Sequence, residues 1–244
     1  MSDPLRVAFV VEGPTDFIML KEVVGRILEG EDFVPEVLQP EMSEAFKVAA
    51  GQGGGWPGVC RWCLQAMEQG EGRLRDNPLF VFHDVVIIQL DADVAGNTYE
   101  QGHIQDPYPG QPTLPFEEDC PPPSATTNRL RSVVLRWIGE QDTPPKTVIC
   151  TPSKALEAWV VVGLFPEDPV LLNENFECRK HPETLLRGKP KRRRLVSGNT
   201  KKRDMYLKYA GEFADNWNTV RGVCTEAVRF DQEFRAVLEQ FLGS

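Results

Sequence analysis

Two short apolar segments of the chain each end in carboxylate residues followed by a glycine. The first occupies residues 10–16 (VVEGPTD) and the second residues 86–96 (VIIQLDADVAG). In an open α/β sheet, whatever follows the carboxyl ends of the strands faces the crevice where ligands bind. The two segments therefore predict that Glu12, Asp91 and Asp93 meet at one edge of a sheet.

Three carboxylates in one place favour a bound cation, because without one they repel each other. Hard oxygen ligands select Mg²⁺ or Mn²⁺. With two ions about 3.5–4 Å apart, one activates water and the other stabilises the leaving oxygen of a phosphoryl transfer. Asp16 lies four residues after Glu12 on the first turn of a predicted helix, where it is either a further metal ligand or an N-cap.

Strand-like and helix-like segments alternate from residue 5 to residue 163, which predicts an α/β fold with a Rossmann-like, mainly parallel sheet flanked by helices. Continuous apolar runs, typical of buried parallel strands, predict strands at residues 6–11, 33–38, 84–90 and 146–150. Helical spacing of apolar residues predicts helices at residues 17–28, 43–50, 57–69, 126–140 and 154–162.

The chain changes character after about residue 165. We expect residues 1–165 to form the domain that carries the site, with a long loop rich in Pro and Gly over residues 97–124. A loop of that length is usually a functional lid or disordered. Residues 166–244 are expected to form a basic segment and a C-terminal helical appendage, with helices at residues 202–213, 219–229 and 231–242.

The net charge of −9 hides a strongly basic stretch between Arg179 and Arg203, where eleven Lys or Arg residues accompany one acid, Glu183. This stretch is either a solvated basic loop or a localised anion-binding patch. A patch that tracks a nucleic-acid backbone predicts salt-sensitive phosphate contacts rather than base reading. Its expected nucleic-acid-binding residues are Lys189, Lys191, Arg192, Arg193, Arg194, Lys201, Lys202 and Arg203.

The six cysteines are expected to be reduced thiols rather than a disulfide framework, because the chain shows no signal-peptide pattern and is not small. An alternative is a zinc site that combines Cys60 and Cys63 with Cys178 and His181. Against it, Cys60 and Cys63 lie in an apolar, helical stretch. No apolar run is long enough to span a bilayer, so a cytoplasmic location and no membrane partner are expected.

Glu12-Gly13 after the first strand and Asp91-x-Asp93-x-x-Gly96 after a later one resemble the Toprim domain. That fold is shared by topoisomerases, bacterial primases and the OLD (overcoming lysogenisation defect) nucleases. The resemblance covers about residues 5–30 and 84–96.

A narrower resemblance is to small bacterial Toprim-like proteins encoded beside ABC- or SMC-type ATPases in anti-phage defence loci. It is carried by residues 12–16 (EGPTD), by residues 153–159 (SKALEAW) and by the late Trp217, Cys224 and Phe230. It implies an ATPase partner and a role as the effector subunit of a defence complex.

The resemblance implies a role for each matching residue. Glu12 resembles the Toprim glutamate, a general acid/base or metal ligand, and Asp91 and Asp93 resemble the metal-binding pair. Lys154 and Glu157 begin the helix after the fourth strand. There, Lys154 either contacts the scissile phosphate while Glu157 completes the metal shell, or the two form a charge pair at the start of the helix.

The function expected from the sequence is a nuclease that depends on Mg²⁺ or Mn²⁺ and hydrolyses DNA or RNA. Two alternatives stay open. One is a Toprim-like scaffold or sensor subunit without catalysis. The other is a phosphatase of the haloacid dehalogenase type, because Asp91-x-Asp93 also resembles the nucleophile motif of that class.

Overall fold

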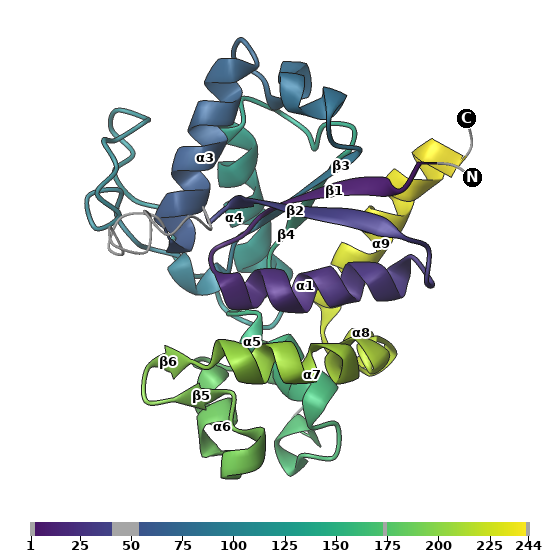
Figure 1. Cartoon of the computed structure of the whole chain (residues 1–244). Helices are drawn as coiled ribbons and strands as arrows, with labels where there is room; N and C mark the ends of the chain where they lie inside the picture. The colour runs from purple at the N-terminus through teal and green to yellow at the C-terminus, as the bar shows by residue number, and fades with distance from the viewer. Residues whose placement is uncertain (1–2, 41–53, 173–174, 243–244) are drawn as a thin grey trace.

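A four-stranded parallel sheet lies at the centre of the molecule (Figure 1). Its strands are β1 (Leu5–Val10), β2 (Phe33–Gln39), β3 (Val85–Gln89) and β4 (Thr147–Cys150), in the order β2-β1-β3-β4. The computed structural model describes residues 3–40, 54–172 and 175–242, and the helix expected at residues 43–50 lies outside them. The predicted α/β class and parallel sheet are confirmed.

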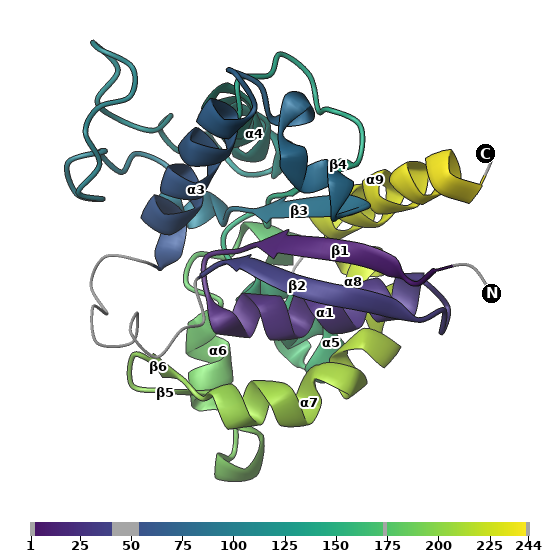
Figure 2. The same ribbon diagram turned by 45° about the horizontal axis from the view of Figure 1, so that its top comes forward.

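Helices cover both faces of the sheet (Figure 2). α3 (Gly55–Gln69) and α4 (Ser124–Trp137) cover one face, and α1 (Pro14–Ile27) covers the other. Side chains of β1 alternate accordingly: Val7 and Phe9 pack with α1, whereas Ala8 and Val10 pack with α3 and α4. Because both faces are covered, β3 and β4 are buried along their whole length, whereas the edge strand β2 is partly exposed.

The C-terminal helices share the core of the sheet. They are α5 (Glu157–Leu164), α6 (Glu183–Gly188), α7 (Arg203–Asp215), α8 (Trp217–Val223) and α9 (Thr225–Leu242). The ring of Trp159 in α5 lies 5.7 Å from that of Trp217 and 6.2 Å from that of Phe230. α7 runs beside α1, and α9 packs on β4 (Figure 1). The C-terminal helices therefore complete the hydrophobic layer on the α1 face of the sheet.

The boundary between the last two helices lies earlier in the chain than the sequence predicts. The sequence suggested a break at Phe230, but α8 ends at Val223 and α9 begins at Thr225. The carboxylate of Glu177 accepts hydrogen bonds from the backbone N–H groups of Thr225 (2.6 Å) and Glu226 (3.0 Å). A carboxylate distant in sequence thus caps the first turn of α9 and sets its start.

Two of the six cysteines form a disulfide, Cys120–Cys178, which corrects the expectation of six reduced thiols. The remaining four are free and buried. The zinc alternative is wrong as well, since Cys178 is bonded to Cys120 while Cys60 and Cys63 are buried in the core between α3 and the sheet.

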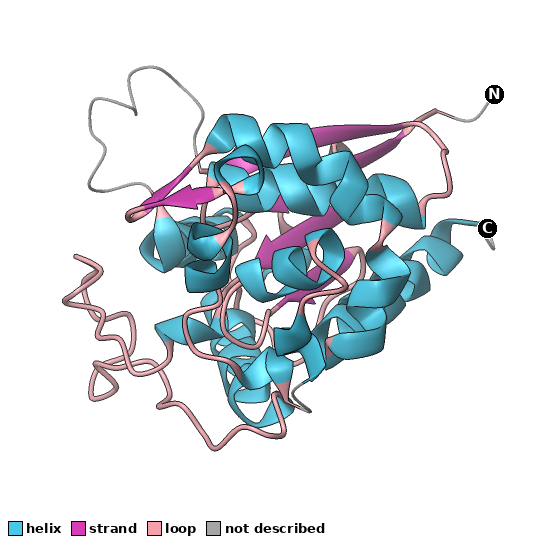
Figure 3. Cartoon of the chain, turned by 90° about the horizontal axis from the view of Figure 1, so that it is seen from below, coloured by secondary structure: helices cyan, strands magenta, loops and turns pink. Residues whose placement is uncertain are grey.

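The segment from Asn97 to Pro123 has little regular structure and forms a long loop (Figure 3). Tyr99 and Leu114 are buried, and the indole N–H of Trp137 donates to the Tyr99 hydroxyl at 3.0 Å. No helix in the described ranges is both long and apolar enough to cross a membrane.

Gly163 tests how tightly the C-terminal helices pack. A Cβ atom there would lie 2.5 Å from Cδ2 of Phe213, so Gly163→Ala is expected to destabilise the fold by about 1–3 kcal/mol. Gly211→Ala is the matched control, because its Cβ would meet nothing within 4 Å and Ala favours a helix by up to about 1 kcal/mol. Urea unfolding measures both; equal stability of the two variants would contradict the packing.

Candidate active site

The ends of β1 and β3 bring Glu12 and Asp91 into direct contact. The strands pair in parallel with Val10 opposite Ile88, so both chains leave the sheet at the same edge. The backbone N–H of Asp91 donates to Oε1 of Glu12 at 2.7 Å. Gln89 bridges the pair: its Oε1 accepts from the Glu12 N–H at 3.0 Å, and its Nε2 donates to Oδ1 of Asp91 at 2.7 Å.

Gln89 is a site residue that the sequence interpretation missed. It is completely buried, and both ends of its amide are used in holding Glu12 and Asp91. The available signal was a single polar residue in the otherwise apolar run VVIIQL. A buried amide needs hydrogen-bond partners, which marks such a residue for a role at a site.

The segment after β4 holds the second aspartate. Backbone N–H groups of Ala92 and Asp93 donate to the carbonyl oxygens of Pro152 (3.0 Å) and Lys154 (2.9 Å). The N–H of Leu156 donates to Oδ1 of Asp91 at 3.1 Å. Asp93 lies at the exposed rim, whereas Asp91 is 6% exposed.

Asp16 and Glu157 lie deeper and share a cation, Lys201. The Lys201 ammonium lies 2.7 Å from Oε1 of Glu157 and 3.5 Å from Oδ1 of Asp16. The Tyr206 hydroxyl donates to the same Oε1 of Glu157 at 2.9 Å. Gly13 gives the Asp16 carboxylate room, because a Cβ there would lie 3.1 Å from its Oδ2. Asp16 is thus a member of the carboxylate cluster; the N-cap of α1 is Gly13, and Asp16 lies in the first turn of that helix.

Lys201 comes from a hairpin that the sequence did not predict. β5 (Val196–Ser197) and β6 (Thr200–Lys201) pair antiparallel and carry the lysine to the start of α1 (Figure 1). The sequence analysis placed Lys201 among nucleic-acid contacts. In the structure its charge is instead shared with Asp16 and Glu157.

Electrostatics of the cluster follow from its burial and its excess of negative charge. Burial raises the pKa of Glu12 to about 8, and repulsion from Asp93 and Asp16 adds to it. Burial also raises the pKa of Asp16 to about 6 and that of Asp91 well above its usual range. The pKa of Asp93 rises to about 6 through lost hydration and repulsion from Glu157.

The same neighbours favour the charged form of Lys201. Burial disfavours its charge, but Asp16, Glu157 and Asp91 together raise its pKa above the ordinary value. It therefore stays an ammonium ion. Five carboxylates around one ammonium leave a surplus of negative charge that favours a proton or a further cation.

The cluster opens into a pocket of about 350 Å³. Glu12, Asp16, Asp91, Lys201 and Arg203 contribute to its wall, together with the first residues of α1 and α3. This is the size of a small-ligand site, and it combines acidic groups with two cations.

The carboxylates suit a hard divalent cation by their donor chemistry, but they are not arranged as finished metal ligands. Within the described ranges, no group of three or more His, Cys, Asp or Glu side chains is placed to hold a metal ion. The cation among the carboxylates is the Lys201 ammonium. Metal binding would thus require these side chains to move.

Lys154 does not reach the carboxylates. Its ammonium pairs with Glu117, which also lies 3.1 Å from Nζ of Lys180. It forms neither the predicted charge pair with Glu157 nor a contact with the pocket wall. Its contribution to the site is its backbone oxygen, which holds Asp93.

The residues of the predicted basic patch have different roles in the structure. Lys189 pairs with Asp168 and lies 4.1 Å above the Phe165 ring. Arg193 pairs with Glu212 and lies over the same ring. These two cations pack the C-terminal helices, which corrects their assignment as phosphate contacts.

The remaining basic residues are differently placed. Arg194 donates from Nε to the carbonyl oxygen of Lys189 at 3.0 Å. Lys191 and Arg192 are exposed, Lys202 directly precedes α7, and Arg203 lines the pocket. Lys201, which pairs with the carboxylates, and Arg203, which lines the same pocket, are therefore the residues that link the stretch to the site.

Comparison of the chain with protein-family models, with curated proteins and with solved structures finds no significant match. Fold and site geometry therefore supply the argument for function.

Glu12→Gln should change how stability depends on pH. The pKa of Glu12 is raised from 4.5 to about 8, so the folded chain binds this proton more tightly than the unfolded chain. That stabilisation is complete below about pH 4.5 and is lost as pH rises through about 8. Gln keeps the Oε1 acceptor and does not ionise. We expect the variant to melt about 2–4 °C above wild type near pH 9.

The difference should vanish below about pH 4.5, where Glu12 is protonated in the folded and in the unfolded chain. Glu68→Gln, an equal charge change at an exposed position of α3, is the control and should follow wild type. Parallel melting curves for Glu12→Gln and wild type across this range would contradict the crowded site.

Proposed function

We propose that the protein hydrolyses phosphodiester bonds of nucleic acid with the help of Mg²⁺ or Mn²⁺. The observation that carries the proposal is the convergence of Glu12, Asp91 and Asp93 at the ends of two adjacent parallel strands, beside Asp16 and Glu157. Buried carboxylates with raised pKa values are typical of functional sites.

A divalent ion would be held by Glu12, Asp91 and Asp93, with Asp16 and Glu157 behind them. When bound, it would supply a Lewis acid and an activated water. The surplus negative charge of the cluster supports this assignment, because a divalent cation would relieve the repulsion that raises the pKa values of Glu12 and Asp91.

Glu12 is suited to move a proton. A general base works best when its pKa lies near the working pH. Burial raises the pKa of Glu12 to about 8 in the metal-free site, and a divalent cation beside it would lower that pKa. The hydrogen bond from the Asp91 N–H fixes one carboxylate oxygen. The other oxygen would accept a proton from an attacking water in the pocket.

Lys201 and Arg203 would bind the phosphate. Both line the pocket, and an ammonium and a guanidinium together balance the charge that develops on a phosphodiester in the transition state. Lys191, Arg192 and Lys202 would contact the backbone of the nucleic acid farther from the bond that is cut. DNA and RNA share this backbone chemistry.

Two other functions remain as candidates. A scaffold or sensor role is favoured by the present position of Lys201, which neutralises part of the cluster in place of a metal. A phosphatase that uses Asp91 as nucleophile is less favoured. Asp91 is buried, and its Oδ1 accepts hydrogen bonds from Gln89 and Leu156.

The narrower role, an effector of an anti-phage complex with an ABC- or SMC-type ATPase partner in the cytoplasm, is proposed on the sequence resemblance. It needs the nuclease activity as its premise. It is tested by copurification with such an ATPase.

Asp91→Ala and Glu12→Gln should each abolish most of the cleavage. Loss of a general base costs about 10²–10⁴-fold in rate, so Glu12→Gln should fall by that factor. The assay follows plasmid, single-stranded DNA and tRNA with Mg²⁺ or Mn²⁺. Glu68→Gln should cleave like wild type.

Cleavage by folded Asp91→Ala at the wild-type rate would overturn the assigned site. A stable phosphoryl group trapped on Asp91 would establish the phosphatase instead. Cleavage by neither wild type nor variants, with or without an ATPase partner, would support the scaffold role.

Arg203→Gln and Arg193→Gln should distinguish phosphate binding from helix packing in the basic stretch. Removing one phosphate contact lowers the salt dependence of binding by about one unit of slope. We expect this for Arg203→Gln, and an unchanged slope but lower stability for Arg193→Gln, which loses its contacts with Glu212 and Phe165. Fluorescence anisotropy of a labelled oligonucleotide at several salt concentrations measures both; equal slopes for the two variants would contradict the division.

A further inference from the structure

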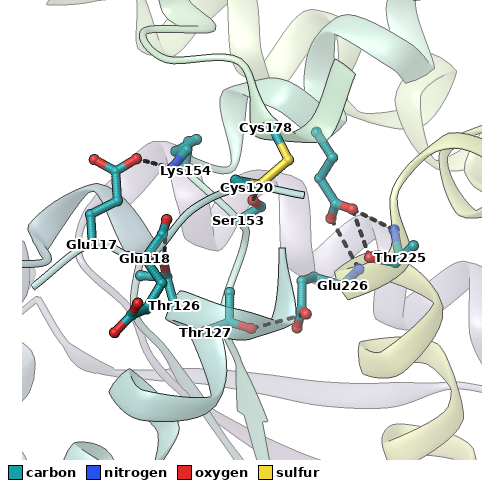
Figure 4. The surroundings of a disulfide bond; sticks show 11 residues. Glu117, Glu118, Cys120, Thr126, Thr127, Ser153, Lys154, Cys178, Thr225 and Glu226 are labelled. Atoms are coloured by element: carbon teal, nitrogen blue, oxygen red, sulfur yellow. Dashed lines mark hydrogen bonds and ion pairs between the residues drawn. A yellow bond between two sulfur atoms is a disulfide. The ribbon is translucent and has the colours of Figure 1, made fainter. Parts of the chain in front are cut away.

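The Cys120–Cys178 disulfide joins two segments that are 58 residues apart in sequence. Cys120 lies just before α4, at the end of the long segment after β3, and Cys178 ends the short 3₁₀ helix Phe176–Cys178. Figure 4 shows the bond between these segments, above the start of α4. Both cysteines are partly exposed.

Other cysteines do not compete with this pair for redox chemistry. Cys60, Cys63, Cys150 and Cys224 are buried. Burial raises the pKa of Cys60 to about 12 and those of the other three well above their usual range. Since the thiolate is the reactive form, the four free thiols stay inert near neutral pH.

Ion pairs connect the same two segments as the disulfide. Glu117, three residues before Cys120, pairs with Lys154 and with Lys180, two residues after Cys178. The Cys120 sulfur also lies 3.9 Å from the Ser153 hydroxyl. The disulfide and the ion pairs of Glu117 therefore connect the same segments side by side (Figure 4).

Lys154 connects this region to the carboxylate site. Its carbonyl oxygen accepts the backbone N–H of Asp93 at 2.9 Å, while its ammonium is neutralised by Glu117 and its side chain is 5% exposed. The side chain of Lys154 is thus paired with a residue of the segment that the disulfide attaches to Cys178.

We propose that Cys120–Cys178 is a reversible redox latch that keeps Lys154 paired with Glu117, and that its reduction by a dithiol frees the Lys154 ammonium for a phosphate at the carboxylate site. The thiolate of the dithiol attacks one sulfur and the other cysteine leaves. The second thiol of the dithiol then attacks the dithiol sulfur of this mixed disulfide, and the remaining cysteine leaves. The products are two cysteine thiols and a cyclic disulfide. Two electrons and two protons pass from the dithiol to the protein.

A disulfide in a reducing compartment is usually transient and redox-sensing. In the expected cytoplasmic setting the latch would open under reducing conditions and close under oxidative stress. The effect on cleavage rests on the proposed nuclease function, but the opening of the latch does not.

Hydrogen exchange tests the latch without any enzymatic readout. Dithiothreitol should increase amide exchange in residues 97–123 and 175–182 and leave β1 and β3 unchanged. Cys120→Ser should show the faster exchange from the start and no response to dithiothreitol. Equal exchange of oxidised and reduced wild type in both segments would overturn the latch, whether or not the Cys120→Ser variant folds.

The cleavage assay tests the link to the site. Reduction should raise the Mg²⁺-dependent rate about tenfold, the effect of one gained charged hydrogen bond. Glu117→Gln should raise the rate of the oxidised protein, and Lys154→Gln should remove the response to dithiothreitol without altering its effect on exchange. Equal rates before and after reduction would refute the link, whereas altered exchange without cleavage in either state would refute the nuclease function and leave the latch standing.

Discussion

Repulsion among carboxylates at the ends of two adjacent parallel strands is the constraint around which this molecule is organised. Glu12 and Asp91 are brought together by strand pairing and held by the buried Gln89. Such a concentration of charge raises the pKa values of the acids and needs compensating donors and cations. The hairpin that carries Lys201, the Tyr206 hydroxyl and the segment after β4 all provide them. Much of the C-terminal third thus serves the edge of the sheet.

The sheet and the meeting of Glu12 with Asp91 could be predicted from the sequence, because both follow from local patterns. Continuous apolar runs identify buried parallel strands, and residues after such strands share one edge of the sheet. The same logic placed Asp93, two residues after Asp91, at this edge, and in the structure the segment after β4 holds it there. It failed at Lys154, whose side chain is turned toward Glu117 by a segment that has no regular pattern.

Other features depend on contacts between residues distant in sequence and leave no local signal. Glu177 caps the first turn of α9, and Cys178 forms a disulfide with Cys120. The basic stretch looked uniform as a sequence, yet Arg193 serves packing while Lys201 serves the carboxylates. Charge composition reports how many cations a segment has, but only the fold decides which of them remain available for a ligand. The disulfide and the Lys154–Glu117 pair show the same principle, because together they join the loop after β3 to the C-terminal helices.

The proposed function depends on whether a divalent cation replaces the single ammonium of this cluster. A crystal structure of the protein soaked in Mn²⁺, read by anomalous scattering, answers that question. We expect an anomalous peak bounded by carboxylate oxygens of Glu12, Asp91 and Asp93, with the Lys201 side chain shifted away from it. Well-ordered carboxylates without a peak in millimolar Mn²⁺, with Lys201 still on Asp16 and Glu157, would show that the cluster does not bind the metal.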